Sequence, residues 1–180
     1  MISSEYKCVF IHISRTGGTS IEQAFDYHGN NTERMMTAHE VKESFTEWGS
    51  HFKFSFIRNP WDRALSTYLH EFQNLSKTTL SFEDWIEEKS SRTCRAYWNQ
   101  SEWITDMDFI GRHETIDQDF SRICKIIGAD LKLEHYINNR TNHSHYSEYY
   151  NGNTRDMVAK WFAKDIEEFS YKFEGKKIFI

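Results

Sequence analysis

Two loops in the first third of the sequence carry residue types that are suited to binding an anion. The first loop, Ser14–Ser20, contains Arg15, the pair Gly17-Gly18 and the hydroxyl groups of Thr16, Thr19 and Ser20. A glycine pair permits positive φ angles and a close approach of the backbone to a ligand, and arginine adds a permanent charge with a fork of N–H donors. This composition predicts a cradle for a phosphate or sulfate group, although an ordinary turn with a surface arginine has the same short pattern.

The second loop places Arg58 directly before Asn59, Pro60 and Asp62, with Ser66 farther along. Asparagine is a preferred N-cap residue, proline suits the first helical position, and aspartate suits the positive end of a helix. Arg58 therefore stands between a strand and a helix, where it could bind a second anion, and Ser66 could meet that anion only beside the helix. The alternative is that Arg58 pairs with a carboxylate and that Ser66 only packs.

Each loop is expected to join a short apolar strand to a helix. The apolar runs at 7–13 and 52–57 predict the strands, and the following residues predict helices at 19–28, capped by Thr19 or Ser20, and at 60–73. A helix N-terminus favours an anion, and ligands of open α/β sheets bind at the carboxyl ends of the strands. Two such sites predict a nucleotide with anionic groups at both of its ends.

The rest of the chain continues this alternation of short strands and helices. We expect further helices at 38–47, 82–89, 117–127 and 154–170, a strand at 106–110 and a last strand near Ile178. Alternating strands and helices predict a parallel sheet. The chain has 180 residues, which is enough for one core, and it contains no repeat or linker. We therefore expect a single domain over residues 1–180.

Together, these segments resemble the two cofactor loops of the sulfotransferases that use 3′-phosphoadenosine 5′-phosphosulfate (PAPS). The first is similar to the family's 5′-phosphosulfate loop, F-x-H-x-P-K-T-G-G-T-S. The second is similar to its 3′-phosphate loop, R-N-P-x-x-R-x-x-S-x-Y, with Arg63, Ser66 and Tyr68 at the later positions. Phe109–Glu114 resembles the family's F-I-G-R-F-E segment, and Tyr146–Phe173 resembles its C-terminal helix and closing strand. The likeness covers nearly the whole chain and is closest to the compact carbohydrate-type branch.

The resemblance implies an α/β fold with three layers, α/β/α, and a short central parallel sheet like that of the P-loop NTPases. It implies a PAPS-dependent sulfotransferase that moves a sulfuryl group to a hydroxyl acceptor, with a carbohydrate or small molecule favoured, leaves adenosine 3′,5′-bisphosphate as the product, and needs no metal. The cofactor-binding residues that it implies are Arg15, Thr16, Gly17, Gly18, Thr19, Ser20, Arg58 and Ser66.

One departure from the family pattern affects the reaction itself. The family usually has Pro-Lys where this chain has Ser14-Arg15. Arginine can still bind and neutralise the phosphosulfate, but it presents a planar fork instead of a point charge. We expect donor binding to survive this change and the catalytic rate to respond to it. Arg63, one turn past the cap, could help to hold the 3′-phosphate or pair with a carboxylate.

Histidine is the residue type best suited to accept the acceptor's proton, because its ordinary pKa lies near neutrality. His39 lies between the two loops, where relatives often place their base, with a plain helix-surface histidine as the alternative. We interpret His12 as structural, His51 as able to face either way, and Glu22 as a capping or supporting residue. The expected catalytic residues are therefore His39 and Arg15.

Composition excludes several other classes. The net charge of −5 argues against a broad surface for nucleic acid or anionic membranes, so anion binding must be local. The three cysteines are scattered, which favours a reducing compartment. No signal peptide or membrane-spanning stretch is evident, so we expect a cytoplasmic protein. His135, His143 and His145 have no cysteine or carboxylate at a defined spacing, so we expect no metal site.

Two other functions fit parts of this pattern. A non-catalytic module that binds adenosine bisphosphate or another phosphorylated ligand is favoured only by arginine in place of lysine at position 15. A nucleotide kinase is disfavoured because the G-x-x-x-x-G-K-[ST] pattern is absent. The acceptor cannot be read from the sequence, and we expect the segments 29–50, 74–105 and 138–153 to select it.

Overall fold

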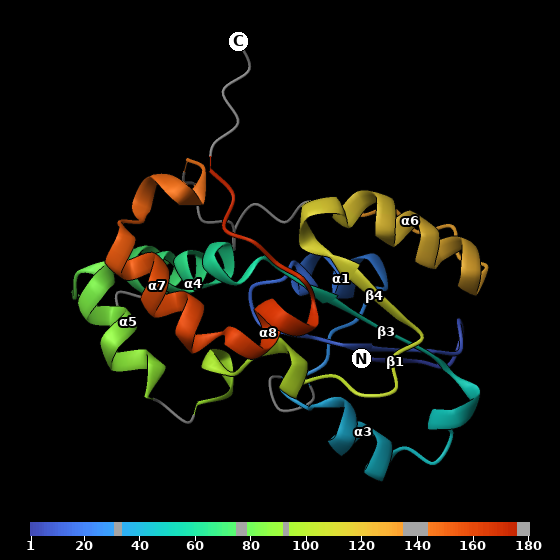
Figure 1. The fold of residues 1–180 in the computed structure, drawn as a ribbon. Coiled ribbons are helices and arrows are strands. Elements are labelled where there is room, and N and C mark those ends of the chain that lie inside the picture. The colour runs from blue at the N-terminus through green and yellow to red at the C-terminus, as the bar shows by residue number, and fades with distance from the viewer. Residues whose placement is uncertain (31–33, 75–78, 92–93, 135–143, 176–180) are drawn as a thin grey trace. The chain divides into compact units, whose positions relative to one another are not determined.

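The computed structural model describes residues 1–30, 34–74, 79–91, 94–134 and 144–175. The chain divides into two compact units: Met1–Arg58 with Gln100–Tyr136, and Asn59–Asn99 with Ile137–Ile180. Figure 1 labels the main elements of both units. Within the described ranges, every helix is too short or too polar to cross a membrane.

The first unit is built on a four-stranded sheet with the order β1-β2-β3-β4. The strands are Ile2–Ser3 (β1), Cys8–Ile11 (β2), Phe52–Ile57 (β3) and Phe109–Arg112 (β4). Strand β1 runs antiparallel to β2, whereas β2, β3 and β4 are parallel to one another. The carboxyl ends of these three strands therefore share one edge, as the alternating pattern predicts. The short edge strand β1 was not predicted.

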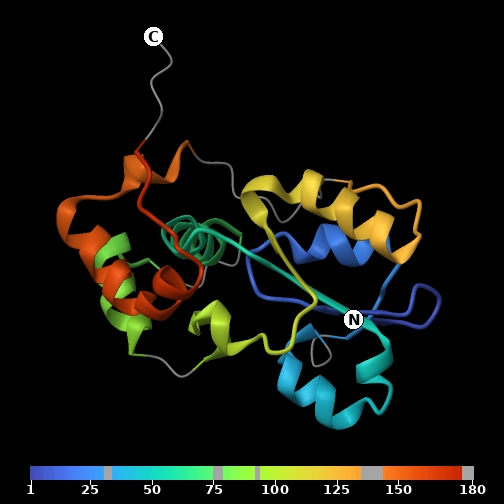
Figure 2. The ribbon, with the colours of Figure 1, turned by 45° about the vertical axis from the view of Figure 1, so that its right-hand side comes forward.

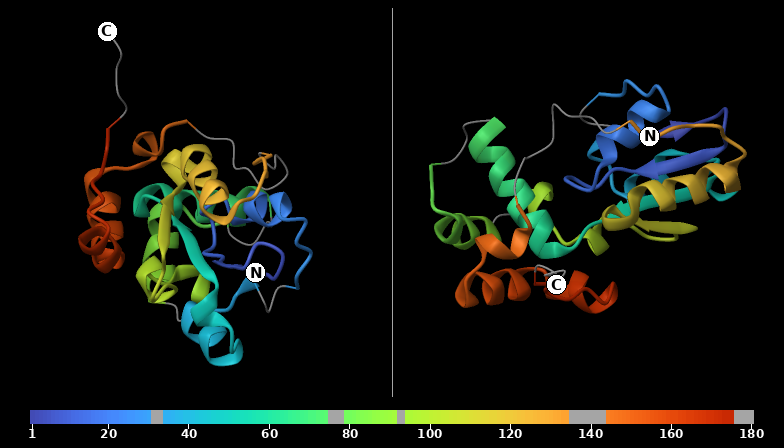
Figure 3. Two further views of the ribbon diagram at one scale, coloured as in Figure 1. Left: turned by 90° about the vertical axis from the view of Figure 1, so that its right-hand side faces the viewer. Right: turned by 90° about the horizontal axis from the view of Figure 1, so that it is seen from above.

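Helices cover both faces of this sheet. Helices α1 (Gly18–Ala24) and α6 (Ile116–Ile127) lie on one face, and α3 (Ala38–Ser44) lies on the other (Figures 2 and 3). The larger core joins the sheet to α1 and α6 through Phe10, Phe54, Phe56, Ile21, Phe120 and Ile123. Short 3-10 turns occur at Trp48–Ser50, Gln100–Glu102 and His113–Thr115. The layers of helix, sheet and helix confirm the predicted three-layer α/β/α architecture.

The second unit is helical in its described part. Its helices are α4 (Pro60–Leu69) with a π-helical turn at His70–Asn74, α5 (Phe82–Ser90), α7 (Gly152–Trp161) and α8 (Ala163–Glu168), with 3-10 turns at Arg95–Tyr97 and Tyr146–Tyr149. Helix α7 packs against both α4 and α5 (Figure 3). The buried Glu71 carboxylate accepts hydrogen bonds from Trp85 Nε1 at 2.9 Å and from Tyr97 Oη at 2.7 Å. These contacts satisfy a charge that would otherwise destabilise the packing.

Several predicted boundaries are wrong. The helix expected at 154–170 is two helices, because the backbone at Phe162 leaves helical geometry (φ −106°, ψ 32°) while its ring stacks on Trp161. The strand expected at 106–110 lies at Phe109–Arg112, since Asp106 has a φ of 52° and the Asp108 side chain accepts a hydrogen bond from Lys53 N. Ile178, and with it the last predicted strand, lies outside the described residues.

The start of α4 gives a prediction about stability. The Asn59 side chain accepts hydrogen bonds from Trp61 N and Asp62 N, as an N-cap does, and its Nδ2 donates to Lys172 O at 3.0 Å. We expect Asn59→Ala to lower the free energy of unfolding by about 1–2 kcal/mol, measured by urea denaturation. Asn59→Asp keeps the oxygen that caps the helix and loses only the Nδ2 donor to Lys172 O, so it should lower the free energy of unfolding by less. An unchanged midpoint in both variants would contradict this role.

Candidate active site

The first loop leaves strand β2 and enters helix α1 through two residues with left-handed backbone. Arg15 has a φ of 68° and Gly17 has a φ of 90°, a conformation that is unfavourable for residues other than glycine and that is found at functional sites. Gly17 is the N-cap of α1, and no side chain caps the helix. The expectation that Thr19 or Ser20 is the cap is therefore wrong, because the helix begins at Gly18, before either of them.

Neither glycine of this loop leaves room for a side chain. A Cβ atom on Gly17 would lie 2.6 Å from Ile116 Cδ1, and one on Gly18 would lie 2.4 Å from His12 Cδ2. The pair is thus fixed by packing as well as by backbone conformation. Helix α1 has only seven residues, so the charged side chains of the loop, not the helix dipole, supply most of its attraction for an anion.

Two arginines meet at the carboxyl edge of the sheet. Arg58 follows the last residue of β3, and its Nη1 donates a hydrogen bond to Arg15 O at 3.1 Å. The Arg58 peptide is held in turn by the buried Gln100, which accepts from Arg58 N at 2.8 Å and donates to Arg58 O at 2.9 Å. Strands β2 and β3 are parallel neighbours, which explains why loops that are distant in sequence come together here.

The electrostatics of this pair favour an anionic ligand. Burial, together with the smaller effect of the positive charge of Arg58, lowers the pKa of the Arg15 guanidinium to about 10. The group still carries its charge at neutral pH, but that charge is poorly solvated and lies close to another positive charge. Anionic groups bound at the two guanidiniums would relieve both penalties.

The remaining residues that the sequence assigned to the cofactor are placed as follows. Thr16 is fully buried, and its hydroxyl donates to Ile13 O at 2.8 Å. Thr19 and Ser20 lie partly exposed in the first turn of α1. Ser66 is buried in α4 of the second unit. Its role toward a phosphate stays a prediction.

Arg63 has contacts that explain its burial without a ligand. It is 1% exposed, and its guanidinium donates to Trp98 O at 2.9 Å and to Ala96 O at 3.2 Å. The same group lies 5.5 Å from the centre of the Phe162 ring. These contacts all stay within the second unit and stabilise its fold.

The candidate bases differ sharply in exposure. His39 lies in the first turn of α3 with 73% of its side chain exposed, and its Nε2 lies 3.2 Å from Glu43 Oε1. His51 is 5% exposed, and its Nδ1 lies 3.1 Å from Glu47 O while the ring packs on Phe45. Because its side chain is exposed, His39 can be reached directly by an acceptor, whereas the buried His51 cannot.

Two histidines flank the glycine pair: His12, for which the sequence predicts a structural role, and His113, which the sequence does not single out. The His12 ring lies against Gly18, and its Nδ1 is 2.9 Å from Glu22 Oε1. The His113 ring lies against Gly17, with Cδ2 3.4 Å from the position of a Cβ there. His113 follows strand β4, at the same edge of the sheet as the arginines. In the family motif F-I-G-R-F-E the second phenylalanine stands where this chain has His113. This departure from the motif is the sequence signal that could have identified His113 as a site residue.

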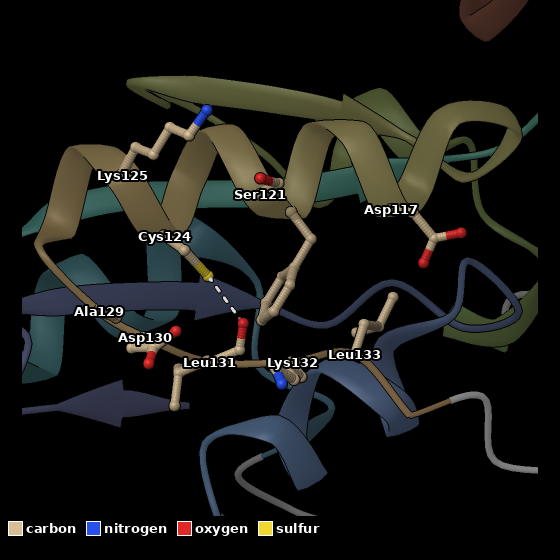
Figure 4. A pocket seen from close by; sticks show the side chains of 10 residues that line it. Asp117, Ser121, Cys124, Lys125, Ala129, Asp130, Leu131, Lys132 and Leu133 are labelled. Carbon is tan, nitrogen blue, oxygen red and sulfur yellow. Dashed lines mark hydrogen bonds between the residues drawn. The ribbon is translucent and has the colours of Figure 1, made fainter.

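A hollow of about 330 Å³ lies elsewhere in the first unit, beside α6 (Figure 4). It is lined by α6 and the segment Ala129–Leu133, and the Cys124 thiol points from α6 toward Leu131 O, 3.9 Å away. Acidic and basic side chains, Asp117, Lys125, Asp130 and Lys132, share its rim. None of the lining residues belongs to the two arginine loops, so we place the candidate site at the loops.

Comparisons with known proteins identify the family of the chain. Residues 1–172 match the model of a family described as the sulfotransferase family. A protein of Archaeoglobus fulgidus described as uncharacterized is 27% identical over 89 residues, which are 47% of this chain and 74% of that protein. The crystal structure of a sulfotransferase from Alicyclobacillus acidocaldarius is similar with a TM-score of 0.44 and 14% identity, over 74% of this chain and 60% of that one. This chain thus covers less than two thirds of that enzyme.

Proposed function

This chain belongs to the sulfotransferase family, and we propose that it moves a sulfuryl group from PAPS to a hydroxyl group, with a carbohydrate as the favoured acceptor. The observation that carries the proposal is the meeting of Arg15 and Arg58 at the carboxyl ends of two neighbouring parallel strands. We treat residues 1–180 as one sulfotransferase domain because the family match runs through both units. A cytoplasmic location and independence from metal are parts of the same proposal.

The residues of the first unit fit an anionic nucleotide. Its two guanidiniums lie close together at low solvation, and its glycine pair packs so tightly against Ile116 and His12 that no Cβ would fit there. Arg15 is suited to bind the phosphosulfate end, and Arg58 is suited to bind the 3′-phosphate. For Ser66 of the second unit the proposal rests on the motif alone.

The donor supplies an activated sulfuryl group, so the protein has to provide position, charge neutralisation and a base. Arg15 would neutralise the oxygen that leaves with the nucleotide, because its charge persists at neutral pH. His39 would accept the proton of the attacking hydroxyl group, and its exposed ring leaves room for the acceptor. The experiment that tests this function is transfer of labelled sulfate from PAPS to a panel of glycans and small alcohols. A folded protein that binds the nucleotide and sulfates none of them would favour the non-catalytic module.

The paired arginines predict a preference among nucleotides. We expect adenosine 3′,5′-bisphosphate to bind more tightly than AMP, as measured by calorimetry. Arg58→Ala should remove most of that preference, because a charge-assisted contact of about 1.5–3 kcal/mol, or about 10–150-fold in affinity, is lost.

The matched control is Arg122→Ala. Arg122 is an arginine of the same unit with 66% of its side chain exposed, and its Nη1 lies 3.2 Å from Asp119 Oδ1. Its removal changes the net charge equally and should leave the preference intact. Equal affinity of the unmodified protein for AMP and the bisphosphate would contradict the proposal of two anion sites.

A further inference from the structure

A fully buried carboxylate lies in the helix that follows the anion-binding loop. Glu22 of α1 has no exposed surface, and its Oε1 lies 2.9 Å from His12 Nδ1 while its Oε2 lies 3.0 Å from Arg34 Nε. His12 follows strand β2, and Arg34 precedes Thr37, the N-cap of α3. Glu22 therefore connects three separate segments of the first unit.

The His12 ring occupies the space beside the first residue of α1. A Cβ atom on Gly18 would lie 2.4 Å from His12 Cδ2 and 2.5 Å from Nε2. On its other sides the ring stacks against Phe10, with 5.8 Å between ring centres, and bonds to Glu22. Only 15% of the side chain is exposed. The ring is thus held in place, and Gly18 of the glycine pair packs directly against it.

We propose that His12 and Glu22 are positioning residues for the sulfuryl donor: the contact of His12 Nδ1 with Glu22 fixes the ring, and the ring fixes the Gly17-Gly18 turn. This inference rests on the proposed donor-binding function of that turn. Because an ionised carboxylate can only accept a hydrogen bond, the contact with Glu22 requires that Nδ1 of His12 carries a proton.

The charge of Glu22 has to be balanced for this arrangement to work. A lone buried carboxylate near the loop would repel the anion that the loop is built to hold. Arg34 lies 3.0 Å from the carboxylate on the side away from His12 and supplies the compensating charge. Arg34 is 32% exposed, so it can remain charged while its partner is buried.

Two isosteric substitutions separate the two ring nitrogens. The amide of His12→Asn takes the place of Nδ1 and can still donate to Glu22, whereas the amide of His12→Gln takes the place of Nε2 and cannot. We expect His12→Asn to bind adenosine 3′,5′-bisphosphate within about threefold of the unmodified protein, and His12→Gln to bind about tenfold more weakly. The same two changes at His28, an exposed histidine 3.1 Å from Asp26, should leave the affinity unchanged.

Each other outcome decides against the proposal. If the glutamine variant binds normally and the asparagine variant does not, Nε2 contacts the ligand itself and His12 is not a positioning residue. Equal losses in both variants, or no loss in either, would show that the bond to Glu22 does not matter to the loop.

A measurement without ligand keeps this inference distinct from the proposed function. Amide hydrogen exchange at Gly17 and Gly18 should be about tenfold faster in His12→Gln than in His12→Asn, with equal thermal midpoints in the two variants. If the unmodified protein fails to bind the bisphosphate, the proposed donor is wrong, and the exchange rates still decide whether His12 and Glu22 hold the turn. Equal exchange rates in the two variants would overturn the positioning role whatever the ligand is.

The contact between the ring and Gly18 is tested by a double-mutant cycle. Gly18→Ala places a methyl group in the space of the ring and should lower the thermal midpoint by about 3–10 °C. The Gly18→Ala/His12→Ala double variant has no ring for the methyl group to clash with. We therefore expect the double variant to have the same thermal midpoint as His12→Ala alone. Purely additive losses would show that the ring does not occupy this space and would overturn the inference.

Discussion

Arg15→Ala is expected to lower kcat by about 10²–10³-fold, because the protein loses the group that neutralises charge on the leaving oxygen. The same variant should bind adenosine 3′,5′-bisphosphate more weakly, since one of the two guanidiniums at the site is gone. The Arg58 contact to residue 15 uses the backbone oxygen and should survive the substitution, so the loop is expected to keep its shape. Steady-state kinetics with PAPS and calorimetry with the bisphosphate measure the two effects.

Arg15→Lys is the matched variant, because it keeps the charge and removes the planar fork. We expect it to keep or raise the activity, since lysine stands at this position in the family pattern and offers a compact charge to the leaving oxygen. Alanine and lysine both carry a Cβ atom, so the strain of the left-handed backbone at residue 15 is the same in Arg15→Ala and Arg15→Lys and cancels when the two are compared. An inactive Arg15→Lys protein with normal thermal unfolding would mean that the guanidinium fork has a role of its own.

The parts of the fold that follow local rules could be predicted from the sequence. Asn59, Pro60 and Asp62 start α4 at the expected residue, and Gly128 ends α6 in the left-handed conformation. The meeting of Arg15 and Arg58 was also predictable, because neighbouring parallel strands bring their carboxyl ends together. These features depend on residues that are close in sequence or on one rule of sheet topology.

The parts that depend on tertiary packing could not be predicted. The start of α1 at Gly18 depends on the left-handed backbone of Gly17, which a serine or threonine cap pattern does not reveal. The contact of His113 with Gly17 joins residues about a hundred positions apart, and the pairing of Arg34 with Glu22 needs the chain to fold back after α1. No local periodicity encodes either contact.

His39→Ala is expected to lower kcat by about 10²–10⁴-fold while leaving the affinity for adenosine 3′,5′-bisphosphate nearly unchanged. The acceptor needs a base for its proton, whereas the donor binds without one, so the two quantities should separate. The pH profile of kcat/KM should also lose its acidic limb, because that limb reports protonation of the base in the free enzyme. The contact of His39 with Glu43 does not oppose this role, since both side chains are mostly exposed and such surface pairs are weak.

His28 provides the control for this experiment, because it is also an exposed histidine beside a carboxylate, with 83% of its side chain exposed. We expect His28→Ala to keep normal turnover, and Glu43→Gln to change kcat by less than about fivefold, because a surface pair contributes at most about 1 kcal/mol. Near-normal turnover of His39→Ala would rule out its assignment as the base.

In that case His51 is a poor replacement as the base because it is almost fully buried. Glu22 is also a poor replacement, because its carboxylate already contacts His12 and Arg34. The next histidine to test would be His113, whose ring lies against Gly17 at the edge of the sheet where the donor is proposed to bind.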